Sequence, residues 1–74
     1  MKDEIEARLT AEFSPASLNV QVDGNHCSVT VVSDRFDGLS KVKRQQLVYA
    51  CLNDKIASGE IHAINISAVG TSEQ

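Results

Sequence analysis

The fold of this chain is decided by residues 36–49, which read Phe36-Asp37-Gly38-Leu39-Ser40-Lys41-Val42-Lys43-Arg44-Gln45-Gln46-Leu47-Val48-Tyr49. Gly38 tolerates backbone angles that other residues avoid, so the first three residues predict a reversal of the chain. Ser40 is a good N-cap, because its hydroxyl can accept a hydrogen bond from a free backbone N–H. We therefore expect a helix that begins after Ser40 and ends at Ser58, where Gly59 supplies the C-terminal cap.

The helix predicted at residues 41–58 has an apolar arc and a basic flank. At about 100° per residue, the apolar side chains that share the arc are Val42, Val48, Tyr49, Leu52 and Ile56. Gln45 falls in the middle of the arc, where it either bonds to backbone or belongs to a small polar site. The cations along the flank are Lys41, Arg44 and Lys55. Leu47 and Cys51 fall on the outer side, where an exposed Leu47 would suit a contact with another protein.

The rest of the chain predicts a second helix and three strands. Residues 3–13 read as a helix, because apolar side chains recur at every fourth position. Residues 17–22 alternate between apolar and polar and are followed by a turn and by a returning strand at residues 27–33, which together predict a hairpin. Residues 61–69 alternate as a third strand. The order is therefore α-β-β-α-β, and the predicted fold class is α+β.

A strand, a crossover helix and a second strand in one sheet are nearly always parallel and right-handed. The strands at residues 27–33 and 61–69 should therefore run parallel, with the first strand antiparallel to the second. Both helices then cover one face of a three-stranded mixed sheet, and the other face is left to solvent or to a partner. The whole chain, residues 1–74, is expected to be one domain, with a loose polar tail at residues 70–74.

A chain of 74 residues with 42% hydrophobic residues has a modest core, and such domains often work with a partner. A homodimer is also left open. No apolar run is long enough to cross a bilayer, and the acidic N-terminus does not resemble a secretory signal, so we expect a cytoplasmic protein. Cys27 and Cys51 do not form a metal-type pair, and a reducing compartment favours two free thiols over a disulfide.

The sequence contains no catalytic motif, so we expect a protein that is not an enzyme. Its two histidines are the most informative polar residues: His26 in the hairpin turn and His62 at the start of the third strand. Imidazole is a ligand for zinc, copper and iron, including iron–sulphur clusters. The alternative is a solvated His26 and a His62 that caps nearby carbonyls. Because two histidines cannot complete a four-ligand site, a metal role would require ligands from another molecule.

Three basic residues, Lys41, Lys43 and Arg44, lie close together at the start of the long helix. They could bind phosphates with the help of the helix dipole, or they could simply keep this face solvated. The net charge of −3 argues weakly against general nucleic-acid binding. No aromatic residue lies among these cations, so stacking on single-stranded bases is not supported.

The stretch at residues 36–49, followed by Gly59-Glu60-Ile61-His62-Ala63-Ile64, resembles the BolA family and its short IbaG-like branch. The resemblance covers nearly the whole chain. It implies a fold like the class II KH domain, although the glycine loop with which KH domains clamp nucleic acid is missing. Many BolA proteins carry a histidine after the helix arginine, whereas this chain has Gln45 there, as IbaG-like proteins do.

The resemblance also implies a function. Members of the BolA family pair with monothiol glutaredoxins in a heterodimer that holds a [2Fe-2S] cluster. One ligand is the histidine of the third strand and the other candidate is a histidine or cysteine of the hairpin, positions that match His62 and His26. The glutaredoxin cysteine and glutathione would supply the remaining thiolates, and Leu47 and the basic flank with Arg44 would help form the contact with this partner. The family is further linked to transcription control through DNA, to acid and envelope stress, and to cell shape.

Overall fold

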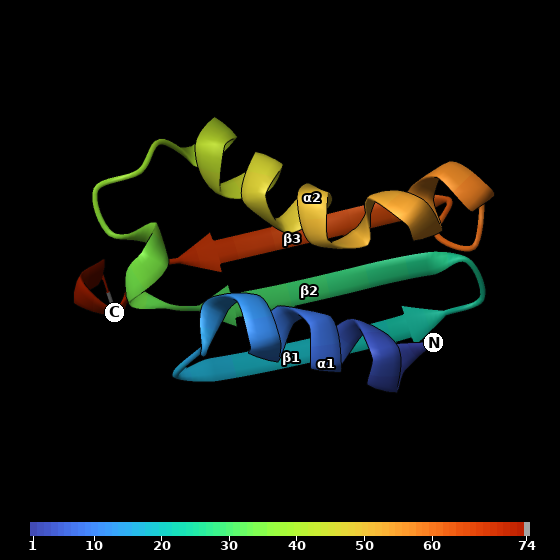
Figure 1. Ribbon diagram of the computed structural model, residues 1–74, viewed down its shortest axis with the longest axis horizontal. Coiled ribbons are helices and arrows are strands. Elements are labelled where there is room, and N and C mark those ends of the chain that lie inside the picture. The colour runs from blue at the N-terminus through green and yellow to red at the C-terminus, as the bar shows by residue number, and fades with distance from the viewer. Residues whose placement is uncertain (74) are drawn as a thin grey trace.

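Two helices lie on one face of a three-stranded sheet in the computed structural model, which describes residues 1–73 (Figure 1). The elements are α1 (Lys2–Phe13), β1 (Ser17–Asp23), β2 (His26–Val32), the 3-10 helix η1 (Asp34–Phe36), α2 (Lys41–Ser58), β3 (Ala63–Val69) and the 3-10 helix η2 (Thr71–Glu73). The predicted α-β-β-α-β order and the α+β class are confirmed. None of the described helices is long and apolar enough to cross a membrane.

The sheet has the order β1-β2-β3, so β2 is central and β3 is an edge strand. β1 pairs with β2 in the antiparallel sense and β2 pairs with β3 in the parallel sense, as predicted. In this register Val29 of β2 lies between Val20 of β1 and Ile66 of β3. The hairpin turn is tight, because only Gly24 and Asn25 separate the strands, and Gly24 has a φ of 62°.

The core lies between the sheet and the two helices. α1 buries Ile5, Leu9 and Phe13, which recur at every fourth position and so form one stripe in the core, where α1 contacts β1 and α2. Phe13 packs against Phe36 of η1 with ring centroids 4.9 Å apart. This contact closes one end of the core, because it ties the end of α1 to the turn that precedes α2.

The buried face of α2 is rotated from the arc predicted for it. Val48 and Leu52 are fully buried, whereas Val42 is 63% exposed and Tyr49 is 41% exposed. Leu47 and Cys51, which were expected on the outer side, pack against the core instead. The reason is that α2 contacts α1 as well as the sheet, so the helix turns the Leu47 flank inwards and leaves the Val42 flank open.

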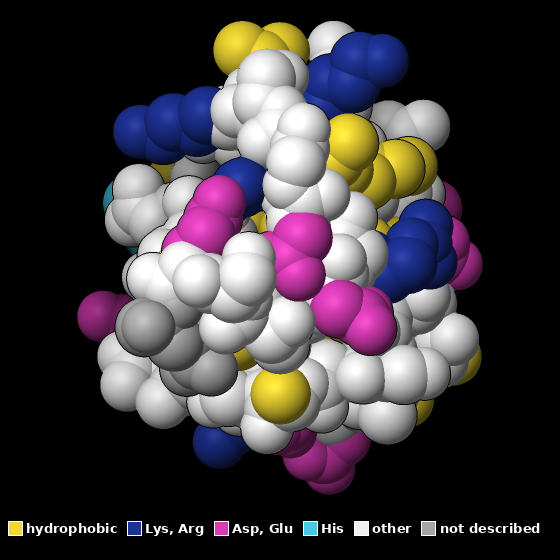
Figure 2. Space-filling view, turned by 90° about the vertical axis from the view of Figure 1, so that its left-hand side faces the viewer, with side chains coloured by type: hydrophobic (Ala, Val, Ile, Leu, Met, Phe, Trp, Pro, Cys, Tyr) yellow, Lys and Arg dark blue, Asp and Glu magenta, His cyan; other side chains and the backbone are white. Residues whose placement is uncertain are grey.

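Residues 70–73, which were expected to form a loose tail, dock against the turn before α2 in this structure. The carboxylate of Asp37 accepts hydrogen bonds from the hydroxyls of Thr71 and Ser72 and from the Ser72 backbone N–H. Glu73 pairs with Arg44 of α2 and accepts from the backbone N–H of Gly70. Figure 2 looks at this end of the molecule, where acidic side chains lie across the middle and basic ones lie around them, two of these groups near the top. Gln74 lies outside the described residues.

Candidate functional site

His26 and His62 lie at the same end of neighbouring strands. His26 is the first residue of β2 rather than a turn residue, and it pairs with Ala63, the residue that follows His62. The backbone N–H of His62 donates to the carbonyl of Asn25 at 2.7 Å, which fixes the segment before β3 against the hairpin. Both histidines are exposed. The structure therefore brings the two predicted ligands to one end of the sheet and leaves both side chains accessible.

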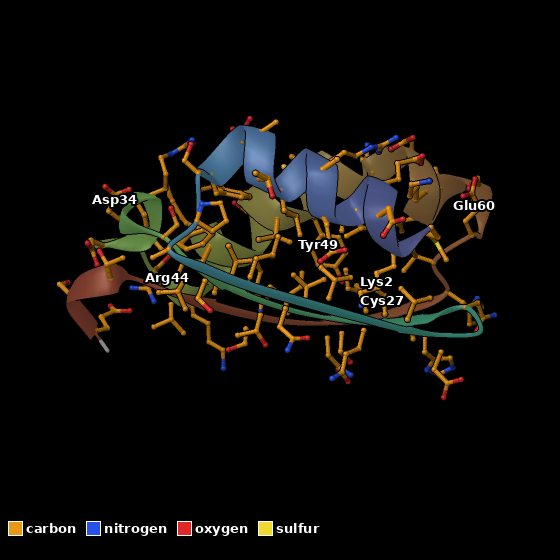
Figure 3. The ribbon with its side chains drawn as sticks, turned by 90° about the horizontal axis from the view of Figure 1, so that it is seen from below. Lys2, Cys27, Asp34, Arg44, Tyr49 and Glu60 are labelled. Carbon is orange, nitrogen blue, oxygen red and sulfur yellow. The ribbon has the colours of Figure 1, made fainter. Side chains whose placement is uncertain are left out.

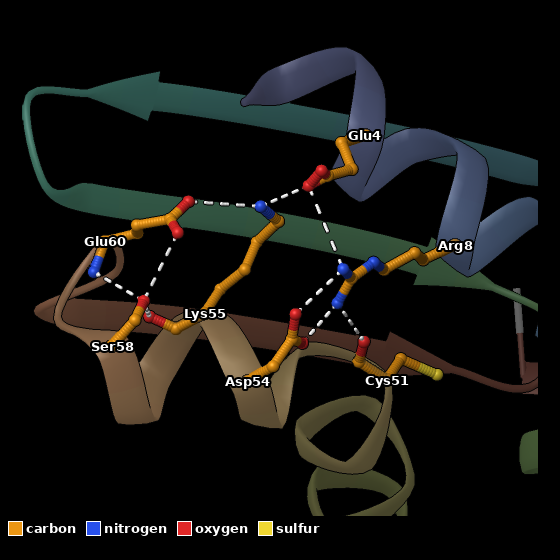
Figure 4. A network of polar contacts seen from close by, with 7 residues as sticks. All are labelled: Glu4, Arg8, Cys51, Asp54, Lys55, Ser58 and Glu60. Carbon is orange, nitrogen blue, oxygen red and sulfur yellow. Dashed lines mark hydrogen bonds and ion pairs between the residues drawn. The ribbon is translucent and has the colours of Figure 1, made fainter.

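The loop that carries His62 is held in place by the end of α2. Gly59 caps the helix with a φ of 85°, and Ile61 is 2% exposed while its N–H donates to the carbonyl of Lys55. The Lys55 side chain is only 7% exposed, and its ammonium pairs with Glu60 at 3.2 Å and with Glu4 of α1 (Figure 4). The buried Ile61 and the ion pair between Lys55 and Glu60 thus hold the loop, so His62 projects from an ordered segment.

The donor set at this end is incomplete for a metal centre. No group of three or more His, Cys, Asp or Glu side chains able to hold a metal occurs within residues 1–73. Cys27 neighbours His26 but faces the core, where it is 2% exposed and burial raises the pKa of its thiol. Cys51 lies half-buried in α2, and its thiol pKa is also raised by burial. The two imidazoles fit a site that another molecule completes, and neither thiol is placed to join them.

The three basic residues at the start of α2 differ in how accessible their side chains are. Lys41 and Lys43 are exposed and take part in no salt bridge within residues 1–73. Figure 3 shows Arg44 beside the C-terminal segment. Its side chain is only 13% exposed, and it donates to the carbonyls of Leu39 and Ala68 and to Glu73. Hydrogen bonding to Glu73 raises the pKa of Arg44 further. Its guanidinium is therefore committed to holding the tail, which corrects the expectation that Arg44 is free for phosphate or for a partner.

Leu47 is likewise less available than expected, because it packs against the core. The surface feature that the sequence did not reveal is a groove between α2 and the outer edge of β3. Its wider part, of about 430 Å³, and its narrower part, of about 260 Å³, share Gln45 and Ile66. One feature of the sequence could have indicated this groove. The apolar arc predicted for α2 is wider than the face that the helix buries, and Val42 and Tyr49 of that arc remain exposed.

Comparison with known proteins decides the family. The family model for BolA-like proteins matches residues 9–73. The chain belongs to the BolA-like family. Over 71 residues it is 41% identical to the acid stress protein IbaG of Escherichia coli, an alignment that covers 96% of this chain and 84% of that protein. The predicted membership of the IbaG-like branch of the BolA family is thereby confirmed.

The names of other BolA-like relatives describe different roles. The DNA-binding transcriptional regulator BolA of Vibrio cholerae is 39% identical over 83 residues, covering 99% of this chain and 77% of that protein. Among solved structures, BolA1 from Arabidopsis thaliana is similar with a TM-score of 0.90 and 30% identity, covering 99% of this chain and 94% of that chain. The BolA domain of SufE1 from the same plant also has a TM-score of 0.90. These relatives are named as stress proteins, regulators or BolA domains.

Proposed function

We propose that this BolA-like protein is a non-enzymatic stress-response adaptor that partners a monothiol glutaredoxin and shares a [2Fe-2S] cluster with it. His62 and His26 would be its ligands, and glutathione and the glutaredoxin cysteine would supply the thiolates. The observation that carries the proposal is the pair of exposed histidines at one end of adjacent strands, with no third donor beside them among residues 1–73. Such a pair is too small a donor set for iron alone and suits a cluster completed by a second protein.

The chain's own contribution would be position and ligand type. The Asn25 carbonyl holds the His62 backbone, and Lys55 with Glu60 holds the loop before it, so both histidines start from fixed backbone positions. Neutral nitrogen ligands in place of thiolates make a cluster less negative and raise its reduction potential. Histidine ligands also take up a proton as the pH falls, which releases a metal. Cluster loss on mild acidification is therefore expected of the proposed complex.

The test is anaerobic co-purification of the chain with a monothiol glutaredoxin and glutathione, followed by visible absorption and circular dichroism spectra. His62→Ala should change the visible circular dichroism strongly and lower the yield of the cluster-loaded heterodimer, and His26→Ala should change the same bands. Asn65→Ala is the matched control, because Asn65 is exposed on the neighbouring part of β3 and has no ligating role. Spectra of His62→Ala that match those of the parent complex would remove the ligand assignment.

A DNA-binding regulator is the second candidate, favoured by exposed Lys41 and Lys43 at the start of α2 and by the name of the Vibrio cholerae relative. Only two of the three predicted cations remain available, because Arg44 holds the tail. Phosphate contacts by two lysines predict that affinity for duplex DNA falls with salt with a slope of about −2. Lys41→Ala combined with Lys43→Ala should flatten that slope, and a slope that stays unchanged would exclude this surface.

A further inference from the structure

The outer edge of β3 presents unpaired backbone groups. The Ala63 N–H donates to Asn25 and the Val69 carbonyl accepts from Ser33, so residues 63, 65, 67 and 69 direct their backbone groups towards β2. Ile64 and Ile66 alternate with them and direct their N–H and carbonyl groups outwards. Within residues 1–73, the outward groups of Ile64 and Ile66 form no hydrogen bond with another element, whereas the outward carbonyl of Ala68 accepts from Arg44. The edge can therefore accept a further strand.

The groove lies beside this edge and offers apolar contacts. The side chains of Ile64, Ile66 and Ala68 are half-buried and form its β3 wall. Its α2 wall includes Gln45, whose side chain makes no hydrogen bond within residues 1–73, and Tyr49. A strand added to β3 would place alternate side chains against these walls, as when extended peptides add to a sheet edge.

The charge of the groove favours extended peptides that carry a negative charge. None of the residues that line it is acidic, although the chain as a whole has a net charge of −3. Lys41 lines the wider part and has no salt-bridge partner within residues 1–73, whereas the charge of Arg44 is already paired with Glu73. The N-terminus of α2 adds a partial positive charge at the same end. A carboxylate on the occupant would therefore be favoured near Lys41.

We infer that the α2–β3 groove binds an extended segment of a partner protein as an added strand, with apolar side chains at alternate positions and a carboxylate near Lys41. This is a second interaction surface, distinct from the histidine end. Lys41 and Ala68 lie towards the end of the sheet where β3 finishes, whereas His62 precedes its beginning. The inference does not depend on cluster sharing, so loss of the cluster would leave peptide binding intact.

The test uses a short acetylated and amidated probe peptide in which valine alternates with threonine and an aspartate stands at each end. Titration into the isotope-labelled full chain should shift the amide NMR signals of residues 41–49 and 64–68. A matched probe with asparagine in place of aspartate should bind about fivefold more weakly, the scale of one exposed ion pair. Lys41→Glu should weaken the aspartate probe by at least as much, and Lys43→Glu, outside the groove lining, should weaken it less.

A backbone control makes the result independent of how well variants fold. N-methylation of the probe at one set of alternate amides removes the donors that pair with β3, whereas methylation at the other set leaves them intact. One methylated probe should lose binding and the other should keep it. Equal binding of both, shifts elsewhere on the molecule, or no binding would overturn the inference. Self-association through β3, or tighter binding of an oligothymidylate at the same residues, would assign the groove to a second copy or to nucleic acid and overturn it too.

Discussion

At the scale of single residues, Gly70 shows how closely the tail is fitted to the body of the protein. A Cβ added at Gly70 would lie 3.1 Å from the Cα of Asp37 and closer still to its carboxylate. That carboxylate accepts the hydrogen bonds from Ser72 and Thr71, and they lower its pKa. The absence of a side chain at residue 70 therefore allows the tail to dock.

Gly70→Ala should lower the free energy of unfolding by about 1–3 kcal/mol, the usual cost of overfilling a packed position. Combining it with Asp37→Ala, which removes the obstructing carboxylate, should cost less than the sum of the two single changes. Urea denaturation of the four proteins measures this coupling. Strict additivity would show that residue 70 does not meet Asp37.

Arg44 is the second residue on which the tail depends. Arg44→Ala removes the donors to Glu73 and to the carbonyls of Leu39 and Ala68, so we expect a lower midpoint of thermal unfolding and loss of protection of the tail amides. Arg44→Lys should recover only part of this, because an ammonium cannot reach all three acceptors. Lys43→Ala is the control and should leave the midpoint unchanged. Equal midpoints for the Arg44 and Lys43 variants would contradict the structural role.

At the scale of elements, the orientation of α2 determines which apolar side chains stabilise the fold. Leu52→Ala should cost about 2–5 kcal/mol because Leu52 is fully buried. Val42→Ala should change stability by no more than about 0.5 kcal/mol, because Val42 is largely exposed. Denaturation of both variants distinguishes the observed face from the one predicted by periodicity. A large cost at Val42 would restore the predicted face.

The sequence predicted the local features of the fold well. Ser40 caps α2 by accepting from the Lys43 N–H, Gly59 ends it, and the hairpin and both pairing directions are as expected. These features depend on neighbouring residues or on general rules of chain topology. The rotation of α2 depends on its contact with α1, and the docking of the tail depends on Asp37 and Arg44. Such contacts join distant parts of the chain, so periodicity within one segment does not reveal them.

The contact between α1 and α2 should also respond to acid. Hydrogen bonding from Arg8 lowers the pKa of Asp54 from 3.8 to about 2 (Figure 4). A depressed folded-state pKa stabilises the native state above the unfolded value, and this stabilisation is lost as the pH falls from about 4 to 2. Asp54→Asn should therefore be less stable than the parent near neutral pH, with a difference that closes over that range. Denaturation at several pH values tests this, and a constant difference would contradict it.

At the scale of the whole molecule, two surfaces lie at different places on one small sheet. The histidine end is formed by the hairpin and by the start of β3, and the groove follows the outer edge of β3 beneath α2. The same strand contributes to both surfaces. A partner could therefore hold a cluster at one end while a peptide segment occupies the edge. The two histidines lie at one end because of the parallel pairing that the sequence predicted, whereas the groove depends on the position of α2, which periodicity did not predict.

The loop before His62 offers a test at this scale of whether the scaffold positions the ligand. Glu60→Gln weakens the contact with Lys55 without altering either histidine. In the proposed glutaredoxin complex, the variant should bind the cluster with altered visible circular dichroism and release it faster under mild acidification. Glu12→Gln, at the far end of α1, is the control. A complex of the Glu60 variant that matches the parent in both spectrum and release rate would show that the loop does not position His62.

The central claim is that this chain supplies histidine nitrogen to a shared cluster, and pulsed electron paramagnetic resonance addresses it most directly. The chain would be labelled with ¹⁵N-histidine, combined with unlabelled glutaredoxin and glutathione, and the [2Fe-2S] cluster reduced by one electron. We predict a ¹⁵N hyperfine coupling typical of directly bound imidazole, which weakens in His62→Ala and disappears when His26→Ala is added. A reduced cluster in the intact heterodimer with no ¹⁵N coupling from this chain would contradict the proposed function.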